Sequence, residues 1–298
     1  MLTRELHTSV GSWNVESSFR YCERLTTRHY ENFPVGSRFL PKDKRKFLYA
    51  VYAFARAADD FADEPGYTAA ERIDNLARWE EQLAECFEDA ASHPVFIALA
   101  ETSRRCRIPR ELFYNLLAAF RSDVTTRRYE SYQSLLEYCS NSANPVGRIV
   151  LSIFNYHDDE LFRLSDLICT ALQLTNFWQD VAVDARQDRI YIPREDLSTF
   201  AYTESQLLRQ HLNGSFAELM NFEVSRTNRL FDEGRPLLQK VSSDLRFELA
   251  LTWHGGTRIL EKIRNRGFDV LSRRPKLSLW DKGLLITRAL AARRNGKA

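Results

Sequence analysis

Apolar side chains recur at intervals of three and four residues along most of the chain, which is the spacing of one face of an α-helix. The pattern is clear over residues 70–90, where the apolar positions are Ile73, Leu76, Trp79, Leu83 and Phe87. Residues 47–56 are apolar on nearly every side, which favours a helix buried between other helices. The pattern therefore predicts helices rather than strands.

The same intervals predict further helices at residues 93–106, 109–124, 131–143, 159–185, 203–212 and 215–238. No stretch alternates convincingly with period two, and no low-complexity linker or short repeat divides the chain. Gly and Pro are sparse, whereas the strong helix formers Ala, Leu, Glu and Arg are common. We expect an all-α protein with a single domain spanning residues 1–298.

Composition places the chain among soluble globular proteins, because 44% of its 298 residues are hydrophobic and 28% are charged. The five cysteines are scattered and form no CxxC pair, which favours a reducing compartment and no structural zinc. The six histidines are too dispersed to suggest a metal site. The first residues lack the apolar core of a signal peptide, and no run of about 18 uncharged apolar residues occurs. We expect a cytoplasmic protein without a transmembrane helix.

Positive charge gathers at the C-terminal end, although the formal net charge of the chain is only +2. From Leu271 onward there are eight Lys or Arg residues and one acid, Asp281. A solvated final helix is the plain interpretation. The apolar residues Leu277, Trp280 and Leu284 among these cations also suit a reversible contact with anionic lipid. Nucleic-acid binding is not expected, since the charge is confined to one segment and no binding motif is recognisable.

Two acidic pairs stand at the ends of predicted apolar helices. Asp59 and Asp63 lie four residues apart in ARAADDFADE, and Asp180 and Asp184 repeat this spacing in NFWQDVAVD. One such pair is usually a solvated helix end, but two pairs emerging from buried helices can face one another across a cavity. Four converging carboxylates are costly unless cations lie between them, and Mg²⁺ is commonly held by carboxylates together with substrate phosphates. The spacing therefore predicts a magnesium site for a diphosphate-bearing substrate.

Aromatic residues lie within or beside the polar motifs: Phe33, Phe54, Phe61, Tyr138, Phe177 and Trp178. Any one of them alone is better explained by core packing. As a group beside a metal site, they fit the walls of a cavity for a long apolar chain whose carbocations are stabilised by π faces.

Three ordered motifs resemble the squalene and phytoene synthases, which are all-helical enzymes that act on prenyl diphosphates. They are RHYENFPVGSRFLPKDKRKFLYAVYAFARAADDFADE, YCSNSANPVGRIV and ALQLTNFWQDVAVDARQDRIYIP, and the similarity extends over residues 17–271. The resemblance implies an isoprenoid synthase fold around a central apolar cavity. The magnesium-binding acids that it implies are Asp59, Asp63, Asp180 and Asp184.

The same resemblance assigns further site residues. The substrate contacts that it implies are Arg56, Arg189, Tyr30, Asn32, Phe33 and Gln179. The catalytic residues that it implies are Tyr138, Gln173, Asn176 and Asn144, with Asn144, Tyr138 and Gln179 as candidates for holding a water molecule. Asp60 and Glu64 are left as either supporting or solvent-facing acids.

Departures from the carotenoid enzymes narrow the resemblance. Phytoene and dehydrosqualene synthases usually read NxxRDxxED in the second acidic motif, whereas this chain has Gln179 for the arginine and Val183 for the glutamate. SANPVG replaces the more usual VAGxVG and places Asn144 and Pro145 in a helix. Together with HYENFPV, these motifs resemble the bacterial hydroxysqualene synthases of hopanoid biosynthesis.

That resemblance implies ionisation of presqualene diphosphate, rearrangement of the cation and its capture by water, a carbon–oxygen lyase reaction with Mg²⁺ and no nicotinamide. It also suggests functional coupling to other hopanoid-pathway enzymes and a peripheral position at the inner membrane. One alternative is head-to-head condensation of two prenyl diphosphates, such as farnesyl diphosphate, to presqualene diphosphate, squalene, dehydrosqualene or phytoene. Another is a non-catalytic assembly protein of the same fold, which the intact acidic pairs disfavour.

Overall fold

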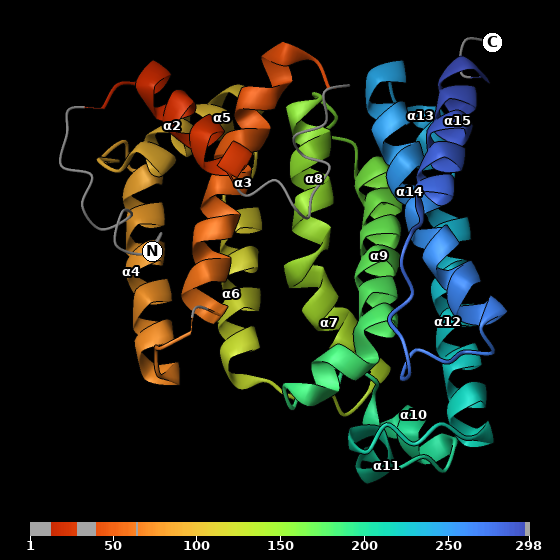
Figure 1. The fold of residues 1–298 in the computed structure, drawn as a ribbon. Helices are drawn as coiled ribbons and strands as arrows, with labels where there is room; N and C mark the ends of the chain where they lie inside the picture. Colours follow the sequence, from red (N-terminus) through yellow and green to blue (C-terminus); the bar gives the residue numbers. More distant parts are fainter. Residues whose placement is uncertain (1–12, 29–39, 64, 296–298) are drawn as a thin grey trace. The chain divides into compact units, whose positions relative to one another are not determined.

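The computed structural model describes residues 13–28, 40–63 and 65–295, and every regular element within these residues is a helix (Figure 1). The all-α prediction is therefore confirmed. The chain divides into two compact units, the first comprising Met1–Thr125 and Arg148–His157, the second Thr126–Gly147 and Asp158–Ala298. A single domain around a central cavity therefore stays a prediction.

Among its described residues, the first unit contains five complete helices and the end of a sixth. They are α2 (Val15–Arg28), α3 (Lys42–Asp63), α4 (Ala69–Phe87), α5 (Pro94–Cys106), α6 (Glu111–Thr125) and the last residues of α8 (Asn144–Ile153). Helix α3 packs against α2, α4, α5 and α6. It begins earlier and ends later than residues 47–56, so it reaches Asp59 and Asp63 before it ends.

The core of the first unit is aromatic. Phe54 of α3 lies with its ring centroid 6.3 Å from that of Trp79, 6.0 Å from that of Phe96 and 5.6 Å from that of Phe113. The indole nitrogen of Trp79 donates to the carbonyl of Phe54 over 3.3 Å. Rings from four helices thus fix α3 in the middle of this unit, because edge and stacked ring contacts are directional.

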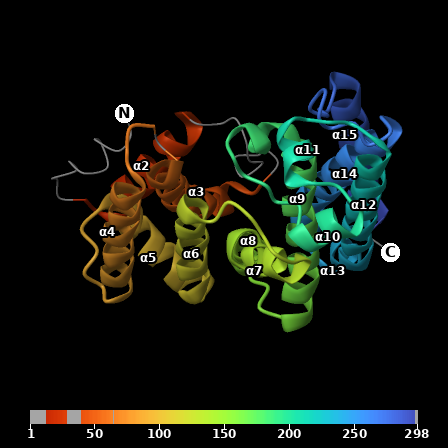
Figure 2. The same ribbon diagram turned by 90° about the horizontal axis from the view of Figure 1, so that it is seen from below.

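The second unit is built around the longest helix. Its elements are α7 (Tyr132–Ser142), the start of α8, α9 (Asp159–Arg186), α10 (Arg194–Thr199), α11 (Glu204–Leu208), α12 (Gly214–Gly234), α13 (Leu237–Lys240), α14 (Ser243–Asn265) and α15 (Leu279–Asn295). Helix α9 packs against α7, α12 and α14, and α15 packs against α14. The view along the helices shows α14 between α12 and α15 (Figure 2).

Close approach between helices depends on glycine at one position of α14. A Cβ atom at Gly256 would lie 2.5 Å from Cζ of Phe231 on α12 and 2.9 Å from Cδ2 of Leu172 on α9. Nothing lies within 4 Å of the corresponding position at Gly255. Gly256 therefore allows α9, α12 and α14 to meet, whereas Gly255 has no such role.

The predicted helices occur with local differences. Residues 203–212 give only the short α11, because Gln210 adopts a φ of 55° and the chain turns there. Residues 131–153 form two helices, since α7 ends at Ser142, Ala143 has a φ of −112°, and α8 begins at Asn144. Asn144 and Pro145 do lie in a helix, at its first positions, where proline's missing N–H costs nothing.

Candidate functional site

Helix α9 presents the second acidic pair on one face. Gln173, Asn176, Asp180 and Asp184 are three or four residues apart, so the helical repeat places their side chains in one line. Asn176 is exposed, whereas the other three are half-buried. The pKa of Asp184 is raised to about 7, first by burial and second by the neighbouring carboxylate of Asp180, against the opposing charges of Arg189 and Arg274. This face therefore holds a pair of carboxylates for which a nearby cation would be stabilising.

A segment that follows α14 crosses this face. The guanidinium of Arg274 makes two contacts with the carboxylate of Asp180, one of them from Nη2 to Oδ2 over 2.9 Å and the other from Nε to Oδ1. The amide of Gln179 donates from Nε2 to the carbonyl of Pro275 over 2.6 Å. Two neighbouring side chains of α9 thus hold two neighbouring residues of this segment, which brings a cation onto Asp180.

A small pocket opens beside Asp184. It is lined by Phe177, Val181, Asp184, Arg189, Ile190, Tyr191, Ile192 and Leu207. Asp188 turns the chain with a φ of 57°, and the backbone N–H of Arg189 donates to the carbonyl of Asp184 over 2.9 Å. The chain therefore folds back over the end of α9 and places Arg189 beside Asp184.

An aromatic cluster forms one side of this pocket. The rings of Phe177 and Tyr191 stack with centroids 3.8 Å apart and planes 6° apart. Tyr138 lies beside both, with its centroid 6.1 Å from that of Phe177 and 6.2 Å from that of Tyr191. Tyr129 lies 5.6 Å from Tyr138 and 5.7 Å from Tyr191. Four aromatic rings from three segments thus gather next to Asp184 and Arg189.

Asn144 is held against α9. Its side-chain oxygen accepts a hydrogen bond from the hydroxyl of Thr170 over 2.9 Å. On the same helix, a Cβ atom at Gly147 would lie 2.3 Å from Oγ of Ser165 and 2.6 Å from Sγ of Cys169. The SANPVG motif therefore docks the start of α8 closely on α9 and fixes the position of Asn144.

The first acidic pair lies at the end of α3, in the other unit. Asp63 is exposed and Asp59 is half-buried. The guanidinium of Arg56 lies 2.6 Å from Oδ1 of Asp60 and 3.5 Å from Oδ2 of Asp59. Asp60 therefore has a role that the sequence left open, because it is the closer ionic partner of Arg56 and holds that cation beside Asp59.

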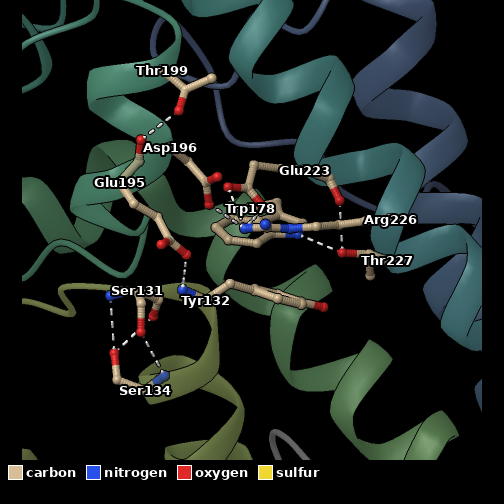
Figure 3. Close-up of polar contacts among 10 residues, drawn as sticks. All are labelled: Ser131, Tyr132, Ser134, Trp178, Glu195, Asp196, Thr199, Glu223, Arg226 and Thr227. Atoms are coloured by element: carbon tan, nitrogen blue, oxygen red, sulfur yellow. Dashed lines mark hydrogen bonds and ion pairs between the residues drawn. The ribbon is translucent and has the colours of Figure 1, made fainter.

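A buried polar cluster of Asp196, Glu223 and Arg226 connects α10 to α12 (Figure 3). Nη2 of Arg226 lies 2.6 Å from the carboxylate of Asp196 on α10 and 2.7 Å from Oε1 of Glu223, and its guanidinium carbon lies 3.6 Å from the ring centroid of Tyr132. Glu195 accepts a hydrogen bond from the backbone N–H of Tyr132 over 2.6 Å. Helix α10 is thus fixed to α7 and α12, and it follows directly on the residues that carry Arg189 and Tyr191.

The same cluster reaches α9 through a hydroxyl group. The indole of Trp178 donates to Oγ1 of Thr227 over 2.8 Å, and that hydroxyl donates to the carbonyl of Glu223 over 2.8 Å. Burial raises the pKa of Glu223 well above its ordinary value, which the charge of Arg226 opposes. The raised pKa favours the protonated form of Glu223, and Arg226 supplies the positive charge that the two buried carboxyl groups share.

Several aromatic residues expected in the cavity are packed in helix cores instead. Phe54 and Phe61 lie in the core of the first unit and are at most 1% exposed. Trp178 is fully buried and its indole nitrogen is already bonded to Thr227. Of the six aromatic residues named above, Tyr138 and Phe177 lie beside the pocket. Tyr30, Asn32, Phe33 and Glu64 lie outside the described residues.

The two pairs of aspartates have the chemistry of magnesium ligands. Each pair has helical spacing on its own helix, α3 or α9, and the pKa of Asp184 is raised by burial and by the neighbouring carboxylate of Asp180. Within the parts of the chain that the structure describes, no group of three or more His, Cys, Asp or Glu residues is close enough to hold a metal ion. Oxygen ligands of this kind suit Mg²⁺, which keeps several waters and shares phosphate oxygens with its substrate.

Three groups of residues at or beside this site were not predicted from the sequence. Tyr191 could have been predicted, because it belongs to the motif RIYIP and lies two residues after Arg189. Arg274 carries no such signal, since it lies 94 residues after Asp180 in a basic segment that reads as a solvated extension. The buried charges of Asp196, Glu223 and Arg226 are also invisible in a pattern that resembles an ordinary amphipathic helix.

Comparison with known proteins assigns the family. The profile of the squalene/phytoene synthase family matches residues 26–281. The chain belongs to the squalene/phytoene synthase family. Enzymes of this family process prenyl diphosphates, and the chain has their isoprenoid synthase fold. The predicted fold and the predicted family are therefore confirmed.

Individual relatives within the squalene/phytoene synthase family differ in their reactions. The crystal structure of squalene synthase HpnC from Alicyclobacillus acidocaldarius is 41% identical, with a TM-score of 0.81 over 85% of this chain and 95% of that one. The hydroxysqualene synthase of Rhodopseudomonas palustris is 32% identical over 84% of this chain and 85% of its own length. The phytoene synthase of Arthrospira platensis is 28% identical over 89% and 90%, respectively. No helix among the described residues is long and apolar enough to cross a lipid bilayer.

Proposed function

We propose that this protein is a hydroxysqualene synthase, which converts presqualene diphosphate and water to hydroxysqualene and diphosphate in squalene and hopanoid biosynthesis. The observation that carries the proposal is the environment of Gln179. This residue stands where the carotenoid enzymes usually have arginine, and its amide holds Pro275 while Arg274 binds Asp180. The similarity to squalene synthase HpnC and to a hydroxysqualene synthase supports the same choice.

The diphosphate end of the substrate would be bound by cations and by magnesium. The proposed magnesium ligands are Asp59, Asp63, Asp180 and Asp184. Mg²⁺ would stabilise the negative charge of the departing diphosphate as a Lewis acid. Arg189, Arg56 and Arg274 would hold diphosphate oxygens, a role that suits the planar guanidinium group. Arg274 would release Asp180 to do so, which leaves the carboxylate available to the metal.

The apolar end of the substrate would lie against the aromatic cluster. The faces of Tyr138, Phe177 and Tyr191 are suited to stabilising a carbocation, because an aromatic ring is negative on its face. Gln173 and Asn176 share the face of α9 that carries the acids, so they would line the path of the rearranging cation.

Capture of the final cation needs one water molecule, from which the oxygen is added to carbon and one proton is lost. Asn144 is a candidate for holding that water because Thr170 fixes its side chain. Tyr138 is a second candidate for holding the water, since its hydroxyl group belongs to the aromatic cluster that it forms with Phe177 and Tyr191. No reductant enters this balance, so no nicotinamide cofactor is required.

The decisive experiment is to incubate the purified protein and Mg²⁺ separately with presqualene diphosphate and with farnesyl diphosphate, and to identify the products by mass spectrometry. We expect hydroxysqualene from presqualene diphosphate alone, with no added nicotinamide. A hydrocarbon or presqualene diphosphate formed from farnesyl diphosphate would refute the proposal in favour of head-to-head condensation. Asp59→Ala and Asp180→Ala should abolish turnover while preserving the far-UV circular dichroism of the helices.

A matched pair of arginine variants tests the proposed diphosphate contact. Arg274→Met should lower kcat/KM about 10- to 100-fold, because a charge-assisted hydrogen bond is worth about 1.5 to 3 kcal/mol. Arg273→Met is the control, since Arg273 is exposed and precedes Arg274 in the same segment. Equal kcat/KM values for the two variants would exclude a direct role of Arg274.

A further inference from the structure

Helix α15 is attached to the second unit along one narrow stripe. Asp281, Leu285 and Ala289 are spaced by four residues and are buried against α14. Asp281 lies 2.6 Å from Nζ of Lys262 and accepts from Nε of Arg258 over 2.7 Å. The backbone N–H of Ser278 also donates to Asp281, over 2.7 Å. These contacts fix the rotation of α15 about its own axis, so the direction of its other faces is defined.

The face of α15 opposite that stripe is apolar and exposed. Leu279 is 85% exposed and Trp280 is 91% exposed, both at the start of the helix. Successive residues of an α-helix are rotated by about 100°, which places a continuous outward arc opposite Leu285. Between Leu279 and Ala292, this arc contains Leu279, Trp280, Gly283, Leu284, Ile286, Thr287, Leu290 and Ala291. None of these side chains is charged, although a solvated face of a final helix normally is.

Cations border the apolar arc on both sides. Lys282 and Arg288 are exposed, and the helical repeat places them about 60° to either side of Leu285. The only acid on the helix, Asp281, is buried and its charge is balanced by Lys262 and Arg258. Between Leu279 and Ala292, the exposed charge of α15 is therefore purely positive and lies along the two edges of an apolar face.

We propose that this apolar face of α15 docks on an anionic lipid bilayer. Apolar residues with a tryptophan at one end, edged by Lys and Arg, match a helix lying in the membrane interface, where the rings and aliphatic chains enter the acyl boundary and the cations meet lipid phosphates. Pairing of α15 with a second copy would bring the same cations face to face, whereas an anionic surface complements them. This docking is separate from the proposed reaction, because it depends on none of the proposed site residues.

Vesicle flotation of the full chain tests the docking. The probes are vesicles of phosphatidylcholine alone and vesicles of phosphatidylcholine with phosphatidylglycerol at a ratio of about 2:1. The wild-type chain should float with the anionic vesicles and much less with the neutral ones. Leu279→Ser with Trp280→Ser should reduce the partition coefficient about tenfold or more, because two large apolar side chains no longer enter the interface. Lys282→Gln with Arg288→Gln should reduce it about fivefold for each lost cation.

The matched control uses exposed leucines elsewhere in the same unit. Leu208 and Leu212 are 45% and 44% exposed, so Leu208→Ser with Leu212→Ser makes the same number of apolar-to-serine changes away from α15. This control should bind the anionic vesicles like the wild type. The proposal is overturned if the wild-type chain floats equally with both vesicle types, or if the two double serine variants bind equally. A dimer in solution that Leu279→Ser with Trp280→Ser dissociates would also overturn it, since the face would then serve a second copy.

Discussion

Arg226 lies between two buried carboxylates, and its removal is the sharpest test of how the second unit is held together. Its side chain is 9% exposed, against 10% for Asp196 and 0% for Glu223. Arg226→Met preserves much of the apolar volume and removes the charge. The variant leaves the carboxyl groups of Asp196 and Glu223 together in the interior without their cation.

The expected loss is about 3 to 5 kcal/mol of unfolding free energy, the usual cost of removing one partner from a buried ion pair. Part of it is the contact between the guanidinium and the ring of Tyr132. Arg229→Met is the matched control, because Arg229 is exposed on the same helix, one turn further on. A surface substitution of that kind should change the unfolding free energy by less than about 0.5 kcal/mol.

Glu223→Gln tests the protonation of the cluster. Because the folded-state pKa of Glu223 lies above its ordinary value of 4.5, the folded chain binds more protons than the unfolded chain as pH rises above that value. The wild type should therefore lose stability with rising pH in this window, by up to about 1.4 kcal/mol per pH unit. The glutamine variant lacks this dependence, so its stability relative to the wild type should increase from acid to neutral pH.

Urea unfolding at several pH values, together with hydrogen exchange of residues 187–200 and 214–234, measures both effects. Faster exchange over residues 187–200 in Arg226→Met would show that α10 and the neighbouring residues Arg189 and Tyr191 have lost their anchor. If Arg226→Met unfolds at the same urea concentration as Arg229→Met, the cluster does not stabilise the unit. If Glu223→Gln follows the pH dependence of the wild type, the assignment of the proton is wrong.

Other predictions follow from individual contacts. Gly256→Ala should lower the unfolding free energy by about 1 to 3 kcal/mol through overpacking against Phe231, whereas Gly255→Ala should raise it by up to about 1 kcal/mol, as thermal unfolding would report. Asp281→Asn should lower Tm at neutral pH, because Lys262 and its other partners hold the pKa of Asp281 well below its ordinary value. The difference from the wild type should shrink as pH falls below that ordinary value, because the unfolded chain then binds the proton before the folded chain does. Burial raises the pKa of all five cysteine thiols. A thiol reagent at pH 8 should therefore label the native chain no faster than the chain unfolds, because the thiolate is the reactive form. Rapid labelling in the absence of urea would contradict this prediction.

Much of the helical architecture could be predicted because it depends on local periodicity. The amphipathic pattern of residues 70–90 gives α4, and the apolar run at residues 47–56 gives the buried centre of α3. Breaks were harder to predict. The boundary between α7 and α8 depends on the backbone of Ala143, which has no sequence signal of its own apart from Pro145. The early end of α11 depends on a positive φ at Gln210, a residue that seldom marks a turn.

The candidate site was predictable where a motif carries it and not where folding brings distant residues together. The line of Gln173, Asn176, Asp180 and Asp184 follows from helical spacing alone. The preference of Arg56 for Asp60 over Asp59 does not, because residues three and four apart are both within reach on a helix. Arg274 could not be found from spacing, since its position depends on how the segment after α14 returns to α9.

Helix α9 carries the acids of the candidate site on one face and contacts the buried polar cluster with the opposite face. Asp180 and Asp184 face Arg274 and Arg189, whereas Trp178 faces inward and is bonded to Thr227 beside the buried cluster. One residue inserted between Trp178 and Asp180 would rotate the acids by about 100° relative to the anchored face. The acids would then leave their arginine partners although the helix and its core remained intact. The spacing between Trp178 and Asp180 is therefore as much a requirement of the site as the aspartates themselves.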